Sequence, residues 1–204
     1  MVVINEEKIQ EFVENIDEND YMQVENLGFS LMVYQKMRGN IDLPAETFIK
    51  IKDILVNYYN HNINTARDFA EYCLVVTGYL IKYNRYEEVL KLYELALKTS
   101  QSNYYKYQDN ADIVETYALV LFYLAEHYFK ERKENMYAIL YYTKAFDVLL
   151  NNKSKMIIRK GNAKYVSWLS DIEDKIKLIT DMEKGDKTAD KRILTEVLNA
   201  GKVQ

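Results

Sequence analysis

The stretch NMYAILYYTKAF, residues 135–146, decides the fold class. Ala138, Tyr142 and Ala145 are spaced four and then three residues apart, so they lie on one face of an α-helix. Small side chains on that face let a neighbouring helix approach closely, and the aromatic ring fills the gap between the two helices. The stretch therefore predicts a helix that is packed against others along this face.

A second stretch, RYEEVLKLYELAL at 85–97, has nearly the same spacing. Tyr93 and Ala96 match the aromatic and the second small residue, and Val89 stands in place of the first small residue. Each stretch follows another helical pattern, so the chain is expected to fold as antiparallel helical hairpins.

The rest of the chain shows the same helical periodicity. No strand-length alternation occurs, and Asn-Gly, Asp-Gly and Gly-Gly turns are absent. Asn64 is expected to cap one helix, and Asn84 and Gly185 to end two others. Polar segments at 100–110 and 151–162 are interpreted as connections. The predicted helical segments are 5–16, 20–38, 44–58, 64–83, 86–97, 111–132, 135–150, 165–179 and 193–198.

These patterns predict an all-α chain in two parts. Residues 1–150 are expected to form a helical-repeat region. Residues 151–204 are expected to form a basic link and a C-terminal helical hairpin that packs on this region, in one cooperative unit.

The predicted helix at 165–179 carries a heptad seam. Its apolar residues are spaced 4, 3, 4 and 3 residues apart, over only about two heptads. Two interpretations stay open: a homodimer formed through this helix, or a long helix packed along its own domain. Polar replacements at Ile172 and Ile176 should give a folded monomer in the first case and unfold the chain in the second. The seam residues are Tyr165, Leu169, Ile172, Ile176 and Ile179.

The two quoted stretches resemble the second helix of a tetratricopeptide (TPR) repeat. Leu121, Leu124, Ala125 and Tyr128 resemble the first helix, with one extra residue in the turn. Over about residues 20–150 the chain looks like the TPR-like repeats of bacterial peptide-sensing regulators and adaptor proteins. Ala96 and Ala145 are 49 residues apart, although TPR repeats recur about every 34 residues. The resemblance implies a short solenoid of stacked hairpins, with a compact helical bundle as the alternative.

In that family the first helix of each pair lines a concave surface that binds peptides or proteins. The lysine and asparagine pattern that holds a C-terminal carboxylate in some TPR domains is absent here, so mixed polar and aromatic contacts are expected instead. The partner-binding residues that the resemblance implies are Glu71, Leu74, Lys82, Phe122, Glu126 and Lys130.

Motifs for catalysis, metal ligation and cofactor binding are missing. The chain has one cysteine and two histidines, too few for a multi-cysteine zinc site or a disulfide framework. Cys73 falls on an apolar helical stripe, where an inert buried thiol is expected. Glycine-rich phosphate loops and nucleophile elbows do not occur. We therefore expect no enzyme, no metal and no cofactor.

A basic segment lies three-quarters along the chain. It has five bases and no acid, and Tyr165 and Trp168 follow nearby, so it could bind a nucleic-acid backbone and stack on bases. The formal net charge of −4 argues against a general nucleic-acid binder, so we rank this second. A solvated turn, or an intramolecular partner for the acidic first helix, is the alternative. The five bases are Lys153, Lys155, Arg159, Lys160 and Lys164.

A tyrosine-rich run at 103–108 is a further candidate surface, since exposed tyrosine is favourable at interfaces. Its alternative is packing over helix ends. No signal-peptide pattern and no apolar run of membrane-spanning length occur, so we expect a cytoplasmic protein without a membrane partner. Altogether the sequence predicts a non-catalytic protein- or peptide-binding regulator or adaptor, ahead of a nucleic-acid-associated factor and a homo-oligomeric structural protein.

Overall fold

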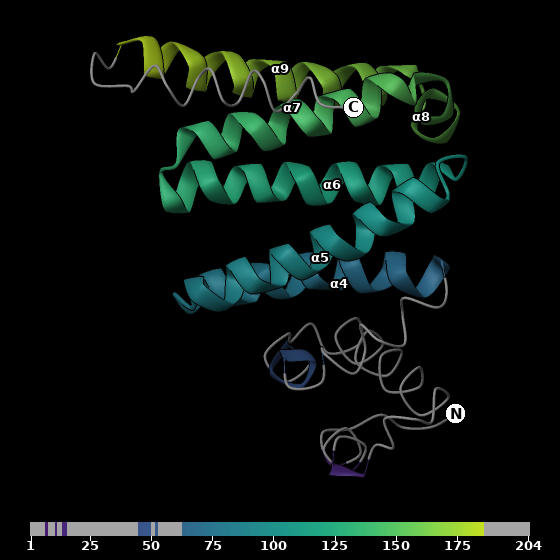
Figure 1. The fold of residues 1–204 in the computed structure, drawn as a ribbon, viewed down its shortest axis with the longest axis vertical. Coiled ribbons are helices and arrows are strands. Elements are labelled where there is room, and N and C mark those ends of the chain that lie inside the picture. Colours follow the sequence, from purple (N-terminus) through teal and green to yellow (C-terminus); the bar gives the residue numbers. More distant parts are fainter. Residues whose placement is uncertain are drawn as a thin grey trace. The chain divides into compact units, whose positions relative to one another are not determined.

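The structure is a computed structural model that describes residues 7, 11, 14–15, 45–49, 52 and 63–185. All regular elements in these residues are helical and none is a strand, which confirms the all-α fold class (Figure 1). The predicted helices at 20–38 and 193–198 lie outside the described residues, and those at 5–16 and 44–58 lie mostly outside them.

Seven helices follow one another between residues 63 and 185. They are α4 (Ile63–Lys82), α5 (Tyr86–Lys106), α6 (Ala111–His127), η1 (Tyr128–Arg132), α7 (Asn135–Asn151), α8 (Lys153–Lys160) and α9 (Asn162–Gly185). The chain divides into two compact units, Met1–Thr99 and Ser100–Gln204, which are described separately below. The boundary predicted near residue 150 lies inside the second unit.

In the first unit, α4 and the beginning of α5 form a hairpin with a short turn (Figure 1). Asn84 has φ 58°, a left-handed conformation that asparagine tolerates better than most residues. Its N–H donates to the carbonyl of Ile81 at 3.0 Å, and the N–H of Arg85 donates to the carbonyl of Leu80 at 3.0 Å. This is a Schellman motif, and it confirms that Asn84 ends the helix. α4 begins at Ile63, within one residue of the start predicted from Asn64.

Aromatic packing and one arginine tie residues 45–49 to this hairpin. The Phe48 ring lies 4.9 Å from the Tyr72 ring in an edge-on contact. The Arg85 guanidinium pairs with Glu88 at 2.5 Å and with Glu46, which also accepts a hydrogen bond from the Tyr79 hydroxyl at 2.7 Å. Arg85 therefore links the α4–α5 turn to a segment that lies 39 residues away in sequence.

In the second unit, α6 packs on α7, α7 packs on α9, and α8 packs against α9 and α6 (Figure 1). Ala138, Tyr142 and Ala145 have no solvent exposure, so the helix face predicted from NMYAILYYTKAF is a packing face. A compact helical bundle would have the same helices and the same buried face. The TPR-like solenoid therefore stays a prediction.

The heptad seam of α9 faces the interior of its own unit. Ile172 and Ile179 are fully buried, and Tyr165 is nearly so, with its hydroxyl 3.4 Å from the carbonyl oxygen of Leu149 on α7. Of the two interpretations of the seam, this burial favours the long helix packed along its own domain. A homodimer through these residues would need their apolar side chains to be accessible to a second copy, and they are already buried inside their own unit.

Two segments that were interpreted as connections are largely helical. α5 continues to Lys106, so only 107–110 form the turn before α6. The link at 151–162 contains α8, which is anchored by the fully buried side chain of Met156. The pattern at 111–132 is α6 followed by one five-residue π-helical stretch, η1, and the next residue, Lys133, has φ 58°.

Candidate functional site

The predicted partner-binding residues of the first unit lie on the outer side of α4. Glu71 and Lys82 are exposed, and Leu74 is half-buried. The Lys82 ammonium lies 5.0 Å from the centre of the Tyr83 ring. Between them, a β-carbon added at Gly78 would meet no atom within 4 Å, so this side of the helix has open space around it.

In the second unit, the predicted residue Glu126 lies at a junction of three helices. Its carboxylate accepts a hydrogen bond from the Tyr142 hydroxyl on α7 and pairs with Lys130 one turn further along the chain. It also pairs with Lys175 on α9 at 2.9 Å. The Glu126 side chain is only 13% exposed, so these three donors replace most of its contact with water. Glu126 is therefore a structural link as well as a candidate contact.

The protonation of Glu126 follows from these contacts. Burial alone would raise the pKa of a carboxyl group, but the bonds from Lys130, Tyr142 and Lys175 outweigh it, and the pKa of Glu126 is lowered. Burial, together with the Glu126 carboxylate, also raises the pKa of Tyr142. The tyrosine hydroxyl thus stays a proton donor, and the carboxylate stays charged at neutral pH.

Two half-exposed apolar side chains extend this region along α9. Leu178 and Met182 follow Lys175 by three and seven residues, on the same helix face, and are 51% and 50% exposed. On α6, Phe122 precedes Glu126 by one turn, and its ring lies 5.6 Å from that of Tyr142. We call this region the α6–α9 surface, made of Phe122, Glu126, Lys130, Lys175, Leu178 and Met182.

The α9 half of this surface was not predicted from the sequence. The TPR resemblance ended near residue 150, so no family position pointed to Lys175, Leu178 or Met182. The spacing of these three residues along one helix face was a signal that could have found them.

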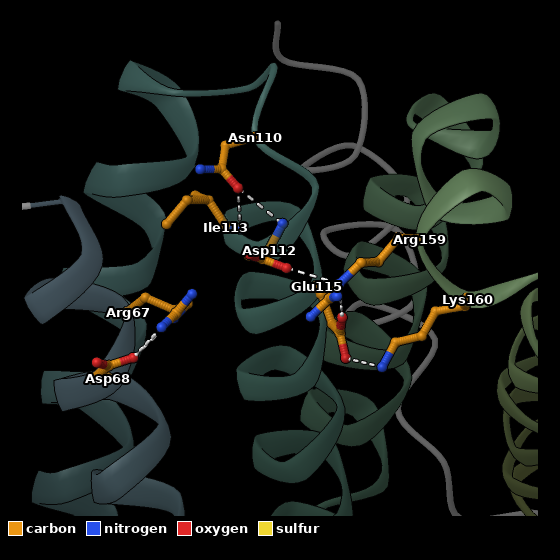
Figure 2. Close-up of polar contacts among 8 residues, drawn as sticks. All are labelled: Arg67, Asp68, Asn110, Asp112, Ile113, Glu115, Arg159 and Lys160. Carbon is orange, nitrogen blue, oxygen red and sulfur yellow. Dashed lines mark hydrogen bonds and ion pairs between the residues drawn. The ribbon is translucent and has the colours of Figure 1, made fainter.

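The basic segment folds onto the beginning of α6 (Figure 2). Arg159 pairs with Asp112 at 2.7 Å and lies 3.5 Å from Glu115, which also pairs with Lys160. Asn110 caps α6 by accepting hydrogen bonds from the N–H groups of Asp112, at 2.9 Å, and Ile113, at 3.4 Å. The acids of this first turn are thereby held beside the bases of α8.

Lys155 joins α8 to the turn before α6. Its ammonium donates to the carbonyl of Gln108 at 2.8 Å and lies 3.3 Å from the carboxylate of Asp109. Three of the five bases, Lys155, Arg159 and Lys160, therefore meet acids at 109–115. The acidic first helix, which was the expected intramolecular partner of these bases, lies mostly outside the described residues. Lys153 and Lys164 are exposed and make no ion pair among the described residues.

The aromatic residues that follow the basic segment do not form a stacking platform as predicted. Tyr165 is 2% exposed because it points into the helix interface, and Trp168 is half-buried. The tyrosine-rich run behaves differently. Tyr104 stacks on Tyr117 with ring centres 4.9 Å apart and accepts a hydrogen bond from Asn152 at 3.2 Å, whereas Tyr105 and Tyr107 are exposed.

Cys73 and His127 are both buried. Burial raises the pKa of the Cys73 thiol, so the reactive thiolate is disfavoured. Burial lowers the pKa of His127 on α6. On α4, Arg67 pairs with its neighbour Asp68 at 2.5 Å (Figure 2). Within the described part of the chain, no three acid, cysteine or histidine side chains are grouped as metal ligands would be.

No protein-family model, curated protein or solved structure matches the chain. None of the helices described between residues 63 and 185 combines the length and the apolar character that crossing a membrane requires.

Proposed function

We propose that the protein is a non-catalytic, cytoplasmic regulator or adaptor that binds a protein or peptide on its helical surface. The observation that carries this proposal is the α6–α9 surface. Leu178 and Met182 expose about half of their side chains, one helical turn apart, beside the ion-paired Lys175. Apolar side chains next to firmly held polar groups are a common composition for a protein interface.

The contacts of Glu126 fix the positions of the helices that carry this surface. Glu126 connects α6, α7 and α9 through its three donors, so the apolar residues on α9 and Phe122 on α6 are held at a defined separation. A preorganised surface loses little conformational entropy when a partner binds. In TPR-like proteins the first helix of each hairpin lines the binding face. The resemblance makes α6 a first helix, so α6 is expected to contribute to that face.

The test combines partner identification with paired surface variants. The tagged full-length chain would be purified from its own host, and stoichiometric proteins that stay bound after nuclease treatment would be identified. The partner would then be titrated against the Leu178→Ser/Met182→Ser variant. Leu150→Ser is a matched control, because Leu150 is a similarly half-exposed leucine at the end of α7.

If a partner covers the exposed halves of the Leu178 and Met182 side chains, this burial stabilises the complex by about 2 kcal/mol, which is roughly a 30-fold change in affinity. We expect the double variant to lose this affinity and the Leu150 variant to bind normally. Equal affinities for the two variants would remove the assignment of this surface, and the absence of any stoichiometric partner would remove the proposed function.

A further inference from the structure

The fold brings two separate sequence motifs to one end of the second unit. The tyrosine-rich run ends α5, and the basic segment forms α8, which lies about 50 residues later in the chain. Lys155 bonds to the carbonyl of Gln108, and Asn152 bonds to the hydroxyl of Tyr104. These contacts hold the end of the tyrosine-rich run against α8. We call the combined region the tyrosine–lysine surface, with Tyr105 and Tyr107 from the run and Lys153, Arg159 and Lys164 from the basic segment.

The aromatic half of this surface has a firm base and exposed rings. Tyr104 is held by its stack on Tyr117 and by the hydrogen bond from Asn152. The Tyr105 ring contacts the Tyr104 ring at 5.6 Å, yet Tyr105 is 65% exposed and Tyr107 is 43% exposed. Two aromatic side chains at the end of α5 thus stand in solvent, two residues apart in the chain.

The basic half keeps a surplus of positive charge. Five bases at 153–164 face three acids, Asp109, Asp112 and Glu115, which leaves a formal surplus of two positive charges. Lys153 and Lys164 are exposed and make no ion pair within the described residues. Arg159 and Asp109 are exposed to solvent in their pairs, and such surface pairs exchange readily for other anions.

We propose that the tyrosine–lysine surface binds single-stranded nucleic acid, a function beyond the proposed protein binding. Unpaired bases stack on Tyr105 and Tyr107, and phosphates lie against Lys153, Arg159 and Lys164. Exposed aromatic rings beside a positively charged track are the combination that single-strand binding uses, because every base has a stacking face and every nucleotide a charge. An acidic peptide would use the bases but has no need of the two exposed rings.

This surface differs from the nucleic-acid site that the sequence predicted. There, Tyr165 and Trp168 were to stack on bases, but Tyr165 is buried. The structure supplies the rings from the other motif instead. At about 0.1 M salt, repulsion between the nucleic acid and acidic side chains more than about 10 Å away is largely screened, so the acidic net charge of the chain opposes this binding only weakly.

The experiment measures fluorescence anisotropy of labelled oligouridylate and oligothymidylate against the full-length protein at low salt. We expect both probes to bind, and Tyr105→Ala/Tyr107→Ala to weaken binding by roughly tenfold or more, as stacking losses do. Tyr123→Ala/Tyr137→Ala is the matched control, since these two exposed tyrosines lie elsewhere on α6 and α7. Circular dichroism would confirm that each variant is folded.

A second pair of variants tests the phosphate contacts. Lys153→Gln/Lys164→Gln should weaken binding and lower the slope of log K against log salt by about 1.4, because each single-strand phosphate contact contributes about 0.7. Lys177→Gln/Lys184→Gln on α9 removes the same charge elsewhere and should leave the slope nearly unchanged.

Three outcomes would overturn the proposal. The first is that neither probe binds the natural protein at low salt. The second is that the Tyr105/Tyr107 variant binds like its control. The third is that polyglutamate binds as tightly as the oligonucleotides and is equally insensitive to the tyrosines, which would make the surface a site for acidic protein. The Leu178/Met182 variant should bind the oligonucleotides normally, so the two proposals fail separately.

Discussion

Replacing Glu126 with alanine should destabilise the second unit by about 3 kcal/mol. The Tyr142 side chain is fully buried, and without Glu126 its hydroxyl loses its acceptor, which costs about 1–3 kcal/mol. Loss of the partly buried pair with Lys175 adds about 0.5–1 kcal/mol after screening by solvent. Lys130→Ala is the matched comparison, because its exposed pair within α6 and η1 is worth about 0.5 kcal/mol or less.

Urea unfolding followed by tryptophan fluorescence measures this difference. Trp168 is the single tryptophan and lies on α9, so its emission reports on the second unit. Glu126→Gln should cost about 1 kcal/mol, because the amide oxygen still accepts from Tyr142 while the charge is lost. If Glu126→Ala and Lys130→Ala have the same midpoint, the three-helix junction does not stabilise the fold and the reasoning is refuted.

The same variant has a pH signature. The folded-state pKa of Glu126 lies below its unfolded value, so the carboxylate contributes stability at pH values above about 4.3 and this contribution is lost as the pH falls through the folded pKa. The alanine variant lacks this carboxylate. Its stability should therefore fall less steeply than that of the natural protein when the pH is lowered below about 4.

The other predictions concern the core, the α4–α5 turn and the cysteine. Ile172→Ala should lower the free energy of unfolding in urea by about 2–5 kcal/mol, whereas Leu178→Ala, on the exposed side of α9, should change it by no more than about 0.5 kcal/mol. If Ile172→Ala instead converts a dimer into a stable monomer, the seam is not internal. Asn84→Ala should lower the thermal midpoint, with a cost of about 1 kcal/mol, because alanine is strained at φ 58°, and Asn84→Gly should not lower it. Cys73 should react with a thiol reagent slowly in the folded protein and rapidly in urea, and equal rates would contradict its burial.

Local patterns were enough to predict the helices that carry a broad apolar face. Ala138, Tyr142 and Ala145 have a spacing that only a helix places on one side, and the structure buries all three. Asn84 was also predictable, because the left-handed turn that ends a helix favours glycine and asparagine.

α8 was missed because little in its own sequence indicates a helix. Its eight residues have one fully buried side chain, Met156, and four bases, which is a composition typical of a solvated link. The helix is supported by partners distant in sequence, Asp112 and Glu115, and no local pattern reveals such pairs. The end of α5 was interpreted as a connection because its residues are mostly polar, although Ser100 and Asn103 are in fact buried.

The candidate site was predicted only in part. Glu126 and Lys130 were named from the resemblance, but their pairing with each other and with Lys175, 49 residues from Glu126, depends on how three helices pack. The stacking role given to Tyr165 was wrong because a tyrosine in a heptad position points inward. Periodicity indicates which face is buried, but it does not indicate which exposed motifs meet.

The π-helical stretch η1 has a consequence for how the chain tolerates changes in length. A residue removed from the middle of α6 would rotate every following side chain by about 100°, and the buried face would no longer meet α7. A residue removed from within 128–132 would instead let the wide turn close to ordinary helical hydrogen bonding, since a π-turn holds one residue more than an α-turn. Single-residue deletions in the α6–α7 hairpin should therefore be tolerated at this stretch and nowhere else along its two helices.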